Sequence, residues 1–290
     1  MDQRRVLPTR RLVAVNSAAA SGNAVHTDEG ARAAGYERAV IGGLTTYGYL
    51  CAYPLREWGA GWLERGGIDV RLRVPIVDQQ PVILSGEMTG YELRARVDAP
   101  LDPHVDSMTQ VPNPGPLALA VAWLGGPGPL PPWSFPFTPP AVKLPPDRLT
   151  TSGLISLPSM EFTPDAIWCS DTLMSTQGAA HDLGVLSGHI STGDPLPPSV
   201  LIDMANLALM NGLDLGTWLH TRSKTQHFTT LRCGDEIEVR SRVVSAEPGE
   251  LGLVSVFEIA FIRGQDVCAR VEHGAVFTDA PLANNSKDRL

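Results

Sequence analysis

The chain has 290 residues, is 43% hydrophobic and 19% charged, and carries a formal net charge of −8. This length is enough for a large buried core and for one or two domains. The acidic balance gives no basic surface for a phosphate backbone, so nucleic acid is not an expected partner. No run approaches the ~18 apolar residues of a membrane span, and the first residues lack the apolar stretch of a signal peptide. We therefore expect a cytoplasmic protein with no membrane segment.

Cysteine and histidine spacing argues against bound metal. The four cysteines form no C-x-x-C pair, and no three histidines share a metal-like spacing. We expect no disulfide framework, no metal and no other cofactor.

The first half of the chain reads as a short strand, a polar loop, an apolar helix and then a series of strands. The helix is predicted over residues 44–58, enters through Gly42 and Gly43, and is apolar on most sides, as for a helix enclosed by a sheet. Alternating apolar and polar side chains predict half-buried strands. These strands cover residues 69–77, 80–88 and 117–124, the last with alanines on one face.

A proline-rich segment separates the two halves. Residues 127–146 contain nine prolines in twenty positions. Proline lacks a backbone N–H and cannot sustain a helix or a central strand, so we expect an extended linker. A recognition motif for a proline-binding module is the alternative. The predicted organisation is an N-terminal unit, a linker, a C-terminal unit and a tail: residues 1–126, 127–148, 149–280 and 281–290.

The second half repeats the order of the first. An apolar helix is predicted over residues 199–219, with Ser199 as a candidate N-cap. Alternation then predicts strands over residues 236–244, 254–262 and 267–277. The recurrence indicates an internal duplication of roughly 130 residues.

The most specific motif lies in residues 21–50. It reads Ser-Gly-Asn-Ala-Val-His-Thr-Asp, followed by an apolar step into the first predicted helix. This resembles the hydratase motif of MaoC-like (R)-specific enoyl-thioester hydratases and dehydratases, Asp-x-Asn-Pro-x-His-x-Asp. The matching positions are Asn23, His26, Asp28, Ala33 and Gly43. The resemblance implies an α+β double hot-dog fold, in which two antiparallel sheets each wrap a central helix and pack as a pseudo-dimer.

Two departures from the family pattern concern the proposed chemistry. Ser21 stands where the family has its catalytic aspartate, and Gly42 where it has the histidine of a His-Gly step. A serine hydroxyl cannot replace a carboxylate as a general base without its own activating group. The first half therefore lacks the intact pair of catalytic groups.

Four residues of this motif are candidate site residues. His26 is the catalytic candidate, because imidazole exchanges protons near pH 7. A loop histidine that only caps the helix beginning after Thr27 is the alternative. Ser21, Asn23 and Gly43 are candidate substrate-binding residues. Asn23 either orients a loop or a water molecule, or forms a simple Asn turn. Gly43 either presents its N–H to a thioester carbonyl or allows close packing of the helix.

The second half offers an acid. His189 begins a His-xxx-Gly-xxxx-Pro pattern, and Asp203 follows fourteen positions after it. This spacing resembles that of hot-dog dehydratases of fatty-acid and polyketide synthesis, which implies a catalytic Asp203 and makes His189 a substrate-binding candidate. A carboxylate in an apolar run is costly unless it is paired or faces a cavity, and burial would raise its pKa. A first-turn carboxylate stabilised by the helix N-terminus is the alternative.

The resemblance implies a lyase, a hydratase or dehydratase of β-hydroxyacyl or enoyl thioesters carried by CoA or an acyl carrier protein. It also implies a possible homodimer. Two alternatives stay open. Asp203 lies in the region where double hot-dog acyl-CoA thioesterases place an aspartate, which favours a thioesterase. The departures at Ser21 and Gly42 favour a non-catalytic acyl-thioester binder or partner subunit. Four other histidines are predicted to be surface or locally bonded residues: His181, His220, His227 and His273.

Overall fold

The computed structural model describes residues 3–100, 115–125, 143–149, 155–176 and 189–278. Most of the predicted linker, residues 127–142, and the predicted tail, residues 281–290, lie outside the described residues. The domain boundaries therefore stay predictions. No helix in the described part of the chain is both long and apolar enough to cross a bilayer.

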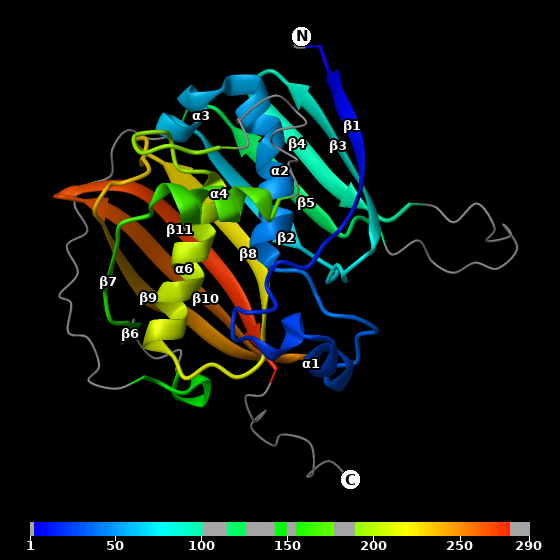
Figure 1. The fold of residues 1–290 in the computed structure, drawn as a ribbon, viewed down its shortest axis with the longest axis vertical. Coiled ribbons are helices and arrows are strands. Elements are labelled where there is room, and N and C mark those ends of the chain that lie inside the picture. The colour runs from blue at the N-terminus through cyan, green and yellow to red at the C-terminus, as the bar shows by residue number, and fades with distance from the viewer. Residues whose placement is uncertain (1–2, 101–114, 126–142, 150–154, 177–188, 279–290) are drawn as a thin grey trace, which may run out of the picture.

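One antiparallel sheet forms the body of the molecule (Figure 1). Within the described ranges it has eleven strands in the order β1-β3-β4-β5-β2-β8-β11-β10-β9-β6, and β7 also pairs with β9. The strands are β1 (Arg5–Val13), β2 (Gly67–Leu72), β3 (Pro81–Thr89), β4 (Glu92–Asp98), β5 (Ala118–Trp123), β6 (Ile155–Ser156), β7 (Met160–Phe162), β8 (Trp218–His227), β9 (Ile237–Gly249), β10 (Gly252–Arg263) and β11 (Asp266–Phe277).

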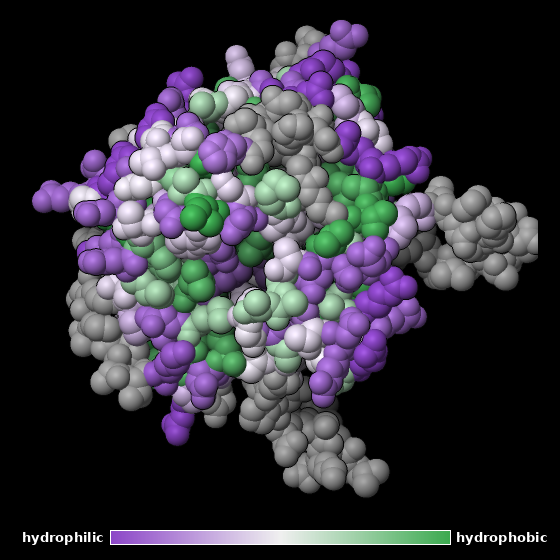
Figure 2. All heavy atoms as spheres, viewed as in Figure 1, coloured by the Kyte–Doolittle hydropathy of each residue, from purple (hydrophilic) through white to green (hydrophobic). Residues whose placement is uncertain are grey.

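Two long helices, α2 and α6, lie together on one face of this sheet (Figure 1). The described helices are η1 (Ala24–His26), α1 (Asp28–Ala33), α2 (Gly43–Trp58), α3 (Ala60–Arg65), η2 (Pro146–Arg148), α4 (Ala166–Met174) and α6 (Pro198–Gly212). The alanines predicted on one face of β5 are buried, and α2 contacts that strand. Their small side chains allow the helix to approach the sheet closely. On the surface, Figure 2 shows mostly polar side chains with small groups of apolar residues between them.

The two halves are joined by main-chain pairing between β2 and β8. The register runs from Gly67 opposite Gln226 to Arg71 opposite Arg222. The two sheets expected from the sequence are therefore continuous. Each strand would otherwise end its half as an open edge with unpaired N–H and C=O groups, and pairing removes both edges.

The second long helix is shorter than the sequence predicts. It starts at Pro198 and ends at Gly212, so Ser199 lies inside it, and residues predicted as its last turn, including Trp218, belong to β8. The apolar run does not stop at Gly212, so periodicity alone could not mark the end. Pairing of β8 with both β2 and β11 decides the strand. No strand is predicted over β4 or β8, and no helix over α4.

Candidate active site

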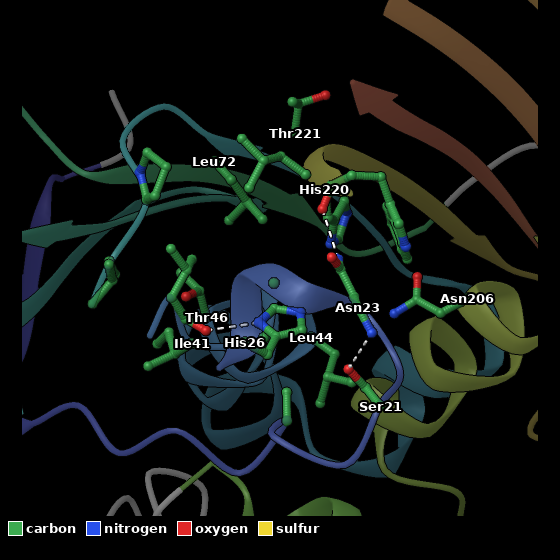
Figure 3. A pocket seen from close by; sticks show the side chains of 18 of the residues that line it. Ser21, Asn23, His26, Ile41, Leu44, Thr46, Leu72, Asn206, His220 and Thr221 are labelled. Carbon is green, nitrogen blue, oxygen red and sulfur yellow. Dashed lines mark hydrogen bonds between the residues drawn. The ribbon is translucent and has the colours of Figure 1, made fainter. Parts of the chain in front are cut away.

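A cavity of about 240 Å³ lies at the seam between the halves. The loop before η1, the start of α2 and the turn after β2 form one side, and α6 and the start of β8 form the other. Figure 3 shows Ser21, Asn23 and His26 from the first half, and Asn206 and His220 from the second, around this cavity. Most of its other lining side chains are apolar.

His26 enters the cavity with a defined tautomer. Its Nδ1 lies 2.7 Å from the carbonyl oxygen of Val40 (Figure 3), and a carbonyl oxygen can only accept. In the neutral ring Nδ1 therefore carries the proton, and Nε2 keeps a lone pair that can accept one. Burial lowers the pKa of His26, and the hydrogen bond to Val40 opposes this only in part. His26 is thus a neutral base at pH 7.

Ser21 and Asn23 hold the loop that carries His26. Asn23 is buried, and its Nδ2 donates to the carbonyl oxygen of Trp218 on β8 at 2.7 Å. Its Oδ1 accepts from the N–H of Val25 at 3.4 Å and caps η1. The Oγ of Ser21, an exposed residue, accepts from the N–H of Asn23 at 3.4 Å. Both residues line the cavity, but the amide of Asn23 is engaged in fastening the loop to the other half.

The N-terminus of α2 opens on the cavity. Gly42, Gly43 and Leu44 line it, and no side chain caps the helix. The first N–H groups of a helix have no partner in their own helix, and the helix dipole makes this end partly positive. The start of α2 can therefore bind a carbonyl oxygen or a developing oxyanion.

Asp203 projects into the same cavity from α6. It is the sixth residue of that helix, so the first-turn alternative does not apply. Burial raises its pKa, and a hydrogen bond from Trp168 lowers it in part. The donor is the indole Nε1–H of Trp168 on α4, 2.7 Å from Oδ2. Asp203 is therefore a carboxyl group whose Oδ2 accepts a hydrogen bond from Trp168 and whose affinity for a proton is increased by burial.

His189 does not line this cavity, so its predicted role in substrate binding stays a prediction. Its side chain is exposed and is not among those that line the cavity. The reason is the course of the following loop. Gly193 donates to the carbonyl of Cys233, and Leu196 to that of Leu231, so this segment packs beside the start of β9 and away from the cavity.

His220 is a site residue that the sequence interpretation missed. It lies on β8, lines the cavity and stacks on His273, with ring centroids 4.2 Å apart. Burial lowers the pKa of His220 to about 4. The sequence does hold a hint, since His220 and Ser223 are three positions apart and bond to each other on one strand. This hint could be used only if β8 had been predicted. Among the described residues, no group of three histidine, cysteine or acidic side chains is placed to hold a metal ion.

Comparisons with known proteins find similarity in structure. No family model matches the chain, and no curated protein matches it. A MaoC-like dehydratase is 12% identical with a TM-score of 0.55, over 94% of this chain and 97% of its own. A protein with a MaoC domain from Chloroflexus aurantiacus J-10-fl is 12% identical with a TM-score of 0.58, over 95% of both chains. A conserved hypothetical protein from Mycobacterium tuberculosis with a double hotdog fold is 10% identical with a TM-score of 0.56, over 95% and 96%.

At this identity the likeness establishes the fold. The chain has the double hot-dog fold of these proteins. The α+β class predicted from the sequence is confirmed, and so, at the level of the fold, is the resemblance to MaoC-like dehydratases seen in residues 21–50.

Proposed function

We propose that this protein is a hydratase or dehydratase of β-hydroxyacyl or enoyl thioesters, carried by CoA or an acyl carrier protein. The observation that carries the proposal is that His26 and Asp203, from opposite halves, line one cavity at which α2 begins. A base, an acid and an oxyanion site are the three groups that this reaction requires.

In the dehydration direction, Nε2 of neutral His26 takes the proton from the α-carbon. The thioester carbonyl oxygen accepts hydrogen bonds from the N–H groups of Gly43 and Leu44, which stabilise the enolate charge. Asp203, in its protonated form, gives its proton to the β-hydroxyl group. The C–O bond breaks, water leaves and the C=C bond forms. The imidazolium and the carboxylate then return to their starting states by exchanging protons with solvent, and hydration is the reverse.

The proton affinities support this division of roles. Burial lowers the pKa of His26, which keeps the ring neutral and able to accept. Burial raises the pKa of Asp203, which increases its protonated fraction. The acid from the second half also accounts for Ser21, which stands where the family motif has its aspartate.

The test is turnover of a series of enoyl-CoA and β-hydroxyacyl-CoA thioesters of increasing chain length. Loss of the conjugated enoyl absorbance without release of free thiol supports the proposal. Thiol release would instead identify the thioesterase. Binding of these thioesters with neither change would refute an enzyme and favour the non-catalytic binder.

Site variants complete the test. His26→Ala and Asp203→Asn should each lower turnover by about 10²–10⁴-fold, the usual contribution of a general acid or base. His189→Ala is the matched control, because that histidine is exposed and outside the cavity. A near-normal rate in either site variant would remove that residue from the mechanism.

A further inference from the structure

The start of α2 is in contact with a histidine from the other half of the chain. A Cβ added at Gly43 would lie 2.5 Å from Nδ1 of His220 and 2.8 Å from its Cβ. Real Cβ atoms essentially never approach so closely. Glycine at the first position of α2 is therefore required because the imidazole of β8 lies directly on it.

The His220 ring is itself held on several sides. Its Nε2 lies 3.1 Å from the carbonyl oxygen of Arg222 and 2.8 Å from Oγ of Ser223. The ring stacks on His273, whose Nδ1 lies 3.2 Å from the same Oγ. Ser223 and His273 are fully buried. These contacts anchor the His220 ring to the sheet.

The charge state of His220 suits its position. A carbonyl oxygen only accepts, so Nε2 carries the proton and Nδ1 bears the lone pair. That Nδ1 is buried and has no hydrogen-bond partner. Its lone pair lies beside the partly positive end of α2, an arrangement that a helix dipole favours and that a protonated ring would reverse.

We propose that His220 is a positioning residue for the thioester carbonyl. By packing on Gly43 it fixes the place and direction of the first N–H groups of α2. The inference rests on the proposed function, since it concerns the oxyanion site of that reaction. The second half thereby contributes to the site both an acid and the support for a helix of the first half.

The packing is tested by a double-mutant cycle read from urea unfolding midpoints. Gly43→Ala alone should lower the midpoint, because the added methyl overlaps the ring. In the double variant Gly43→Ala/His220→Ala the methyl enters the vacated space. We expect its midpoint to lie above the value that the two single shifts predict together. Additive shifts would overturn the inference.

The effect on the carbonyl is tested with a saturated acyl-CoA labelled with ¹³C at the thioester carbonyl, which binds but cannot be dehydrated. We expect the bound carbonyl resonance of wild type to move downfield, His220→Leu to lose most of that shift, and His220→Asn to retain part of it. In the turnover assay, His220→Leu should lower kcat about tenfold or more while KM changes less, since an oxyanion contact acts in the transition state.

The outcomes separate the two proposals. An unchanged carbonyl shift and kcat in a folded His220→Leu would overturn the inference alone, because a merely structural histidine would behave in this way. Absence of thioester binding by wild type would overturn the proposed function and this inference with it.

Discussion

Trp168 should control how readily Asp203 takes up a proton. Its indole N–H donates to Oδ2 at 2.7 Å, and this bond opposes the burial that raises the pKa of Asp203. Phenylalanine keeps an aromatic ring, although a smaller one, and has no hydrogen-bond donor. Trp168→Phe should therefore raise the pKa of Asp203 further, because the ionised form loses more than the protonated form.

The size of this pKa change follows from the hydrogen bond that Trp168→Phe removes. A hydrogen bond to a charged acceptor contributes about 1.5–3 kcal/mol, and one to a neutral acceptor about 0.5–1.5 kcal/mol. The ionised carboxylate thus loses about 1 kcal/mol more than the protonated acid, which is about a fivefold gain in proton affinity.

The sign of the pH dependence is fixed by linkage. The pKa of Asp203 is raised in the folded state, so the folded protein binds more protons than the unfolded chain between the two pKa values. The free energy of unfolding therefore falls as the pH rises through this range. Trp168→Phe should deepen that fall by about 1 kcal/mol and extend it to higher pH.

The assay is urea unfolding of wild type and Trp168→Phe at a series of pH values from about 3 to 8. The same substitution in an Asp203→Asn background is the control, and there its cost should not depend on pH. Parallel pH curves for wild type and Trp168→Phe would refute the reasoning, since they would mean that the indole does not discriminate between the two states of the carboxyl group.

Three further predictions concern the loop and the seam. Since burial lowers the pKa of His26 from its ordinary value of 6.5, kcat/KM should not fall as the pH is lowered to that value, and any loss caused by protonation of the ring should begin only below it, in a pH–rate profile. Asn23→Ala should lower the free energy of unfolding by about 1–3 kcal/mol in urea, because it leaves the carbonyl of Trp218 unpaired. Arg222→Met should lower the free energy of unfolding, measured in urea, by about 1 kcal/mol at low salt and by less at high salt. The reason is that it removes ion pairs with carboxylates on β2 and β11.

Each of these has a result that would contradict it. A decline in rate that begins above pH 6.5 would show that His26 is not the base or not buried in the working state. For Asn23 the matched control is Ser21→Ala, whose exposed hydroxyl should contribute no more than about 0.5 kcal/mol; equal losses in both variants would argue against the bond to β8. If the effect of Arg222→Met on the free energy of unfolding did not depend on salt, the contribution of Arg222 at the β2–β8 junction would come from packing and not from charge.

The strands of this protein were largely predictable from the sequence. The predicted strands over residues 236–244, 254–262 and 267–277 correspond to β9, β10 and β11, and only residue 236 lies outside them. The first long helix was predictable as well, since Gly42 and Gly43 precede a run that is apolar on most sides. The motif in residues 21–50 located His26 and the start of α2, both of which line the cavity.

The end of α6 and the existence of β8 were decided by the tertiary structure. Apolar residues continue through residues 199–219 beyond the end of the helix, so a helix and the beginning of a strand are not separated by the pattern alone. What separates them is the pairing of β8 with β2 and β11. Hydrogen bonds between segments far apart in the chain leave no local periodicity.

The sequence by itself indicated the candidate site residues of the first half and a candidate acid in the second. Only the tertiary structure decided which of them meet: it placed His26 and Asp203 on one cavity, left His189 outside, and brought Trp168 and His220 to the site. The physical reason is that local side-chain patterns record which face of an element is buried. The contacts that tune a site are made between elements, here α4 with α6 and β8 with the start of α2.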